Sequence, residues 1–136
     1  MTNSNPASTP TVEKPMTWPT ADFSRVPYDV FTDPQIYRLE MDKLFRGEVW
    51  NYLGMECEIP AWGDYQTTWI GDTQIVVTRA KDGSVNAFEN SCAHRGARIV
   101  DKLRGNAKRH TCPYHLWTYN LAGELTGVPL EKAEAV

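Results

Sequence analysis

Two short cysteine-and-histidine pairs constrain this chain more than any other feature. The first pair is Cys92 and His94, one residue apart, and the second is Cys112 and His115, two residues apart. The seventeen residues 95–111 separate the two pairs. In each pair the cysteine comes first and the histidine follows within one turn of loop. Two such loops facing each other can hold a metal group from both sides, so the pattern predicts a metal site.

This donor set is typical of a Rieske-type 2Fe–2S centre, in which two histidines replace two of the four cysteine ligands. We therefore expect Cys92 and Cys112 to bind one iron as thiolates. His94 and His115 would bind the second iron through imidazole nitrogen. A structural zinc site is the alternative, because two cysteines and two histidines also suit tetrahedral zinc. Zinc fingers separate a cysteine pair from a histidine pair, whereas each arm here mixes the two, so the spacing favours iron and sulfur.

The rest of the pattern predicts a mainly β protein: a small antiparallel sandwich or barrel that carries the two loops, preceded by one N-terminal helix. The helix is expected over about residues 33–46, because Asp33 can cap it, Pro34 suits its first position and apolar residues follow. Beyond it, apolar and polar residues alternate with a period of two between short turns. Strands are expected at residues 49–53, 56–59, 65–70, 73–79, 85–89, 111–112 and 117–120.

Length and composition allow one globular domain with its own core. The chain has 136 residues, of which 41% are hydrophobic and 23% charged. We expect a disordered, proline-containing tail over residues 1–20, a helical segment over 21–47 and the 2Fe–2S domain over 48–136. The formal charge is −3, and neither a membrane span nor a signal peptide is visible, so we expect a cytoplasmic protein without a membrane partner.

The residues around both pairs resemble those of a known family. They read Asn90-Ser91-Cys92-Ala93-His94-Arg95-Gly96 and Cys112-Pro113-Tyr114-His115-Leu116-Trp117-Thr118-Tyr119. Further similar runs are Trp50-Asn51-Tyr52-Leu53-Gly54 and Leu125-Thr126-Gly127-Val128-Pro129. Over about residues 18–129 the chain resembles the N-terminal Rieske region of the α (large) subunit of aromatic-ring-hydroxylating dioxygenases. It is most similar to the branch that acts on salicylate, anthranilate and terephthalate.

The resemblance implies a function in electron transfer. A ferredoxin or flavin-containing reductase would supply electrons, which would pass on to a mononuclear Fe(II) site for the oxygenation of an aromatic carboxylate. In the family that Fe(II) is held by two histidines and a carboxylate in a C-terminal catalytic domain. This chain has three histidines, and His110 alone lies outside the two pairs. We therefore expect that the catalytic domain is absent, that the chain has no catalytic residue, and that its partners are that domain, other α subunits in a trimer, and β subunits.

A free-standing Rieske ferredoxin is the alternative function. Such carriers generally begin directly with strands, so the expected helix disfavours this alternative. Residues 95–109, the basic arm, carry a net charge of +5, which suits either the docking of an acidic electron donor or an ordinary solvated loop. The remainder of the chain is acidic, and no aromatic platform is interleaved with basic residues, so nucleic-acid binding is not expected.

Several other residues carry expectations of their own. Cys57 is expected to be a small buried residue in a strand, and His110 to lie at the surface or in a strand. Tyr114 and Trp117 are placed to cover the centre, although Trp117 can equally be ordinary core packing. Leu116 departs from the family pattern, in which Gly or Gln is commoner, and this affects the local turn. With few hydrogen bonds to its sulfurs, the cluster should have a potential near the low end of the Rieske range, about −150 mV.

Overall fold

The structure is a computed structural model that describes residues 24–129. The chain divides into two compact units, Met1–Trp50 and Asn51–Val136. The tail expected over residues 1–20 lies outside the described residues. No helix within residues 24–129 is long and apolar enough to cross a membrane.

The first unit is helical in its described part. A 3₁₀ turn, η1 (Tyr28–Phe31), precedes the α-helix α1 (Pro34–Glu40), which continues as a π-helical stretch, η2 (Met41–Phe45). The Asp33 carboxylate caps α1 by accepting a hydrogen bond from the Gln35 N–H at 2.7 Å. A proline occupies the first helical position, where its missing N–H has no partner to lose. The expected helix is confirmed, with a change to π geometry in its second half.

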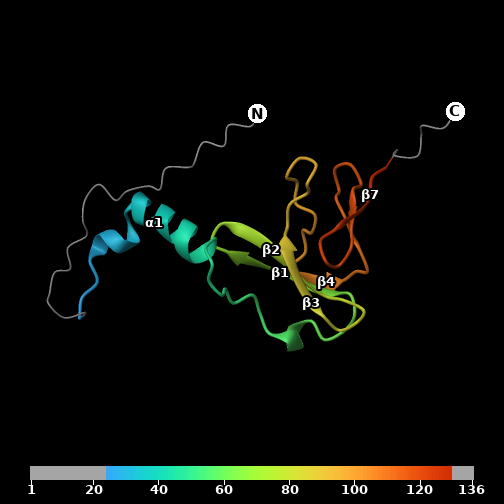
Figure 1. The fold of residues 1–136 in the computed structure, drawn as a ribbon, viewed down its shortest axis with the longest axis horizontal. Helices are drawn as coiled ribbons and strands as arrows, with labels where there is room; N and C mark the ends of the chain where they lie inside the picture. Colours follow the sequence, from blue (N-terminus) through green and yellow to red (C-terminus); the bar gives the residue numbers. More distant parts are fainter. Residues whose placement is uncertain (1–23, 130–136) are drawn as a thin grey trace. The chain divides into compact units, whose positions relative to one another are not determined.

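The second unit contains two antiparallel sheets (Figure 1). The first has the order β3-β2-β1-β4 and comprises β1 (Asp64–Ile70), β2 (Thr73–Arg79), β3 (Val85–Glu89) and β4 (Arg104–Asn106). The second has the order β5-β6-β7 and comprises β5 (His110–Thr111), β6 (Thr118–Tyr119) and β7 (Leu125–Gly127). The mainly β fold class is therefore confirmed.

The strands β1 and β2 form a tight hairpin because their sequences suit a half-buried sheet. β1 contains Thr, Ile and two aromatic residues, and β2 contains Thr, Val and Ile, all of which strands favour. Their register pairs Ile70 with Thr73, which leaves Gly71 and Asp72 as a two-residue turn. Gly71 has a φ of +56°, the left-handed conformation that such turns require.

The larger core joins the first sheet to the two cysteine-bearing segments. Its apolar members come from β1, β2, β6 and the segments around both cysteines, so the thiols lie inside the packed interior. The buried residues are Tyr65, Val76, Cys92, Ile99, Val100, Cys112 and Tyr119. A site anchored in this core is held by the same packing that stabilises the fold.

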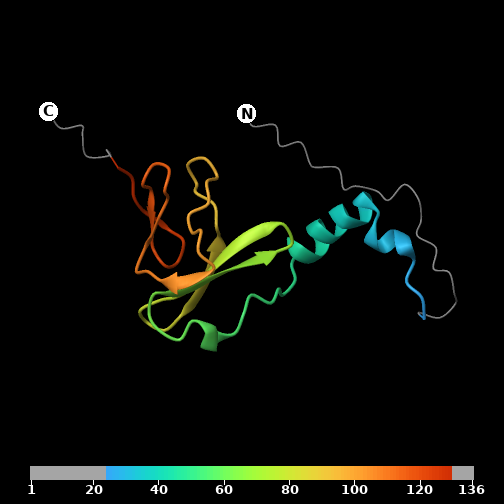
Figure 2. The same cartoon turned by 180° about the vertical axis from the view of Figure 1, so that it is seen from behind.

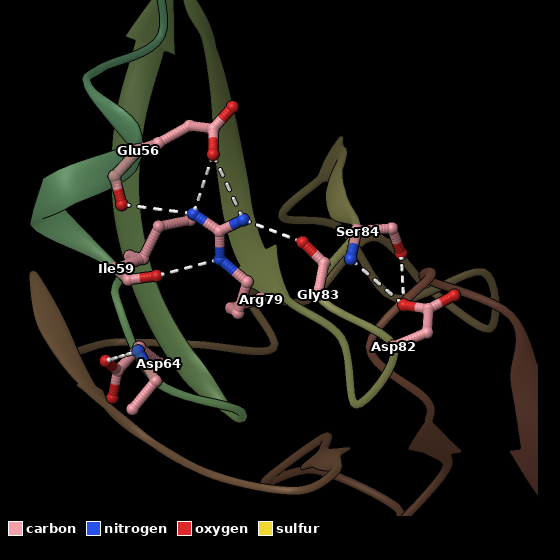
Figure 3. Close-up of polar contacts among 8 residues, drawn as sticks. Glu56, Ile59, Asp64, Arg79, Asp82, Gly83 and Ser84 are labelled. Atoms are coloured by element: carbon pink, nitrogen blue, oxygen red, sulfur yellow. Dashed lines mark hydrogen bonds and ion pairs between the residues drawn. The ribbon is translucent and has the colours of Figure 1, made fainter.

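Arg79, at the end of β2, ties the segment before β1 to the sheet (Figure 3). Its guanidinium donates to the carbonyls of Ile59, Gly83 and Glu56 at 3.0, 2.7 and 3.1 Å. It also donates to the Glu56 carboxylate at 3.2 Å. The side chain of Arg79 is only 12% exposed, so these bonds satisfy a largely buried cation.

Two expected strands do not form in the described part of the chain. Residues 49–53 have no regular structure, and residues 56–59 contain a 3₁₀ turn, η3 (Glu56–Glu58). Cys57 lies on this turn with an exposed thiol, so the prediction of a buried strand residue is wrong. Conversely, β4 and β7 were not expected from the sequence.

Candidate metal centre

The four predicted ligands lie on two loops of the second unit. Loop 1 (residues 91–99) connects β3 to β4, and loop 2 (residues 112–117) connects β5 to β6. Figures 1 and 2 show the gold segment that follows β3 running beside the orange-to-red segment that leads to β7, in both views. The fold thus brings together two short stretches that are far apart in the sequence.

Both loops have the same backbone hydrogen-bond pattern. In each, the cysteine N–H donates to the carbonyl five residues later, at 2.8 Å. The cysteine carbonyl in turn accepts from the N–H four residues later, at 2.7 Å for Cys92 and 3.1 Å for Cys112. The fourth residue after each cysteine is left-handed: Gly96 has a φ of +69° and Leu116 a φ of +62°. The loops are therefore equivalent turns, except that loop 2 places a leucine where glycine is the suitable residue.

Replacing Leu116 with glycine is expected to stabilise the protein by about 0.5–1 kcal/mol. A left-handed non-glycine residue costs roughly 1–2 kcal/mol, and the extra freedom of glycine in the unfolded chain offsets part of that gain. Urea unfolding of the two proteins measures the difference. The mirror variant, Gly96→Leu, should lose stability. A less stable Leu116→Gly protein would show that the leucine side chain makes contacts that outweigh its backbone strain.

The two thiols of the site are buried next to each other. Cys92 is 3% exposed and Cys112 is 1% exposed, and neither forms a disulfide. Burial raises the pKa of the Cys92 thiol, but hydrogen bonds from the Tyr119 hydroxyl, the His94 N–H, the Cys112 thiol and the Arg95 N–H outweigh it. The net pKa of Cys92 is lowered, which favours the thiolate that binds metals.

The two imidazoles lie at the exposed edge of the site. The ring centroids of His94 and His115 are 4.7 Å apart, with an interplanar angle of 76°. Both histidines are exposed, whereas both cysteines are buried. The four predicted ligands therefore form a buried thiol pair and an exposed imidazole pair.

This arrangement fits a 2Fe–2S centre better than a single metal ion. Tetrahedral zinc needs four donors around one point, whereas the Rieske centre needs one sulfur pair and one nitrogen pair on different irons. Within residues 24–129, no group of three or more His, Cys, Asp or Glu side chains is placed to hold one ion. The chemistry and the pairing of the donors both suit the iron–sulfur group.

Tyr119 contributes to the site, although no feature of the sequence singled it out as a functional residue. Its hydroxyl oxygen lies 3.1 Å from the Cys92 sulfur and accepts a hydrogen bond from the Ala93 N–H at 3.0 Å. Burial, followed by the hydrogen bond to Cys92, raises the pKa of Tyr119, so the phenol keeps its proton and can donate it to the sulfur. This bond adds to the few hydrogen bonds expected at the sulfurs. Its one sequence signal is a tyrosine in a short strand directly after loop 2.

Tyr119→Phe is expected to lower the reduction potential of the cluster-loaded protein. A donor to a ligand sulfur stabilises the more negative, reduced form, so its removal favours the oxidised form. A differential stabilisation of about 0.5–1 kcal/mol corresponds to roughly 20–40 mV for one electron. Voltammetry measures the shift. Tyr114→Phe, which removes an exposed hydroxyl next to His115, is the matched control and should leave the potential unchanged; equal shifts in both variants would contradict the role of Tyr119.

Asn90 fixes the base of loop 1. Its side-chain oxygen accepts from the N–H groups of Ile99 and Val100 at 3.0 and 2.9 Å. Its side-chain nitrogen donates to the Val100 carbonyl at 2.7 Å and to the Gln74 side chain at 3.0 Å. Asn90 is 6% exposed, and these bonds satisfy its whole amide while joining the entry and exit of the loop.

His110 was expected either at the surface or in a strand. It lies in the strand β5 and is buried. Its ring contacts Tyr65 edge-on, with centroids 5.1 Å apart, and Phe88 at 6.0 Å. The Nε2 atom has no hydrogen-bond partner in the described part of the chain. Burial lowers the pKa of His110, so the neutral imidazole is favoured.

His110 is expected to make stability depend on pH. Its folded-state pKa lies below the ordinary 6.5, so the unfolded chain binds more protons as the pH falls below that value. Above about pH 6.5, His110 is neutral in both states and does not reduce the free energy of unfolding. As the pH falls below that value, the unfolded state takes up the proton first and the free energy of unfolding decreases. His110→Phe should remove this component and, by eliminating an unpaired buried nitrogen, add about 1 kcal/mol of stability at neutral pH. Urea unfolding of the parent and of His110→Phe at several pH values tests both expectations. If stability changed with pH in the same way in the two proteins, His110 would not be the source of the pH dependence.

Residues 49–135 match the family described as the Rieske [2Fe-2S] domain. Since the match covers more than half of the chain, the protein belongs to this family, and its cofactor is the 2Fe–2S cluster to which the donor pairs are suited.

The more particular likeness is to the large subunits of ring-hydroxylating dioxygenases. The chain is 48% identical over 117 residues to the anthranilate 1,2-dioxygenase large subunit of Burkholderia cepacia, which covers 86% of this chain and 28% of that protein. It is 49% identical over 115 residues to the terephthalate 1,2-dioxygenase terminal oxygenase component subunit alpha 2 of Comamonas sp. That match covers 85% of this chain and 28% of the relative.

Among solved structures, naphthalene 1,2-dioxygenase from Rhodococcus sp. bound to indole is similar with a TM-score of 0.73 and 38% identity. This likeness covers 80% of the present chain and 24% of that chain. The protein thus spans little more than a quarter of the length of the curated relatives it matches.

Proposed function

We propose that Cys92, His94, Cys112 and His115 hold the 2Fe–2S cluster and that the chain transfers electrons as the N-terminal part of an aromatic-ring-hydroxylating dioxygenase α subunit. When bound, such a cluster supplies one-electron transfer. The observation that carries this proposal is the pairing of two buried thiols behind two exposed imidazoles.

Each part of the site has a distinct task in this proposal. The core around Cys92 and Cys112 excludes water from the two cysteine sulfurs, which would hold the cluster as thiolates. The Tyr119 hydroxyl stabilises negative charge on the Cys92 sulfur. The exposed rings of His94 and His115 form the edge through which electrons enter and leave.

The likeness to large oxygenase subunits, together with α1 before the β domain, supports this function over a free-standing Rieske ferredoxin. In the whole protein, electrons from a ferredoxin or a flavin-containing reductase would serve the oxygenation of an aromatic carboxylate at a mononuclear Fe(II) site in the catalytic domain. We place the 2Fe–2S domain at residues 48–136 and expect assembly with other α subunits and with β subunits. We also propose a cytoplasmic location, where the exposed thiol of Cys57 would stay reduced.

The basic arm offers fewer charges to an electron donor than its composition suggests. Arg104 forms an ion pair with Glu58 at 2.5 Å, and the Lys108 ammonium lies 3.9 Å from the centroid of the Trp62 ring. These two cations hold the arm against the segment before β1. The basic residues left to meet an acidic donor are Arg95, Arg98, Lys102 and Arg109.

Iron and acid-labile sulfide analysis of the purified chain tests the proposal. We expect about two irons and two sulfides per chain, a red-brown colour and an electron paramagnetic resonance (EPR) signal after reduction. One zinc per chain in a colourless protein would overturn it. Iron without acid-labile sulfide would overturn it equally, because mononuclear sites contain none.

A further inference from the structure

No protein group in the described part of the chain orients the imidazole of His94 or His115 through a hydrogen bond. A ligating histidine normally donates its second ring N–H to a carboxylate, a carbonyl or water, which fixes the plane of the ring. Within residues 24–129, neither imidazole has a hydrogen bond to a protein group. Both side chains are also exposed, so burial does not hold them. The contacts that the described residues do make with the two imidazoles are contacts between rings.

Trp117 provides such a contact to His94. The indole and imidazole rings are nearly parallel, with centroids 4.8 Å apart and an interplanar angle of 13°. Stacked rings at this separation attract each other beyond the effect of their buried area. A parallel neighbour also restricts rotation of the imidazole out of its plane. Trp117 belongs to loop 2, whereas His94 belongs to loop 1, so the stack joins the two loops.

The indole is itself held in place. The carbonyl of Trp117 accepts the Cys112 N–H at 2.8 Å, which is one of the two bonds that shape loop 2. Its side chain packs against the core that contains both thiols. It also directly precedes β6 (Thr118–Tyr119). The position of the ring is therefore set by the fold before any metal is bound.

His115 has no equivalent support. Its neighbour Tyr114 lies with its ring centroid 5.5 Å away at a tilt of 53°, and Tyr114 is 71% exposed. An exposed, tilted ring restricts an imidazole less than a half-buried, parallel one. His115 also meets the His94 ring edge-on, with centroids 4.7 Å apart and an interplanar angle of 76°. A change at Trp117 should consequently affect His94 directly and His115 less.

We propose that Trp117 is a positioning residue for His94: its indole holds the imidazole of the opposite loop in the plane that presents its nitrogen to the iron. The inference rests on the proposed function, because it takes His94 as a ligand. It assigns to Trp117 more than core packing, since packing alone does not require a parallel stack on an exposed histidine.

The test compares Trp117→Leu, which removes the stack, with Trp117→Phe, which keeps an aromatic face. Trp69→Leu, the loss of an exposed tryptophan on β1, is the matched control. Pulsed EPR of the reduced, cluster-loaded chain measures the couplings of the two ligand nitrogens. The rate of iron loss to a chelator measures how firmly the group is held. Should the leucine variant fail to fold, Trp117→Met replaces it with the same expected result.

In Trp117→Leu we expect one nitrogen coupling to change or broaden clearly more than the other, and iron loss to be roughly threefold to tenfold faster. Trp117→Phe should restore most of both properties, and Trp69→Leu should match the parent protein. Unchanged couplings in Trp117→Leu, or equal changes at both nitrogens, would overturn the inference while leaving the proposed function intact. A parent chain without iron and sulfide would overturn both.

Discussion

Replacing Cys112 with alanine will leave the purified chain without its colour and with less than about a tenth of the parent's iron and acid-labile sulfide. Cys112 is 1% exposed, in the core, so no water or neighbouring side chain can substitute for the lost thiolate. One iron would keep a single protein ligand, and the cluster would not assemble. Cys92→Ala should behave in the same way, because the two thiols lie side by side.

Cys57→Ala is the matched control for this result. It makes the same chemical change at the exposed thiol of η3, which belongs to neither loop, and should retain the parent's iron and sulfide. Circular dichroism of each variant shows whether the sheets remain folded. Full iron and sulfide in a folded Cys112→Ala protein would mean that the ligands have been assigned wrongly. The same conclusion would follow if Cys57→Ala lost the cluster.

The sequence predicted those elements whose local pattern agrees with their tertiary setting. The hairpin of β1 and β2 has β-branched residues on both sides of a Gly-Asp turn, and the structure has these strands almost to the residue. Residues 49–53 alternate in the same way, yet Trp50 and Tyr52 are exposed. Alternation forms a strand only where a partner edge is available, and β1, the next strand in the chain, already has a neighbour on each side.

The strand β4 was not predicted, because it forms without the alternating pattern that is typical of a strand. Its three residues, Arg104–Asn106, are all exposed, so they show no apolar alternation. Their pairing depends on Gly105, where an added Cβ would lie 2.5 Å from the Tyr65 hydroxyl, and on backbone bonds to β1. Such a close approach is set by the fold and has no signature within three residues of sequence.

The site likewise contains features that follow from the local sequence and features that depend on the folded chain. The residue types and spacing of the four proposed ligands were sufficient to predict an iron–sulfur centre, because donor chemistry is a local property. The groups that support it are joined across the two loops: Tyr119 bonds to a cysteine 27 residues away, and Trp117 stacks on His94. Neither contact follows from the spacing, because each depends on how the loops face each other in the folded chain.

His115→Cys is expected to keep a cluster but to lower its reduction potential by on the order of 100 mV or more, because Rieske centres with two histidines lie well above centres with four cysteines, near −400 mV. An anionic thiolate stabilises ferric iron better than a neutral imidazole, so the oxidised form gains more from the exchange. His115 is the better of the two histidines to replace, because replacing His94 would also remove its parallel stack with the Trp117 indole. His110→Cys makes the same substitution at the buried histidine that we do not assign as a ligand, and it should leave the potential unchanged. Voltammetry of the three proteins at one pH decides the matter: a potential unaltered in His115→Cys, or lowered equally in His110→Cys, would mean that His115 does not bind the iron.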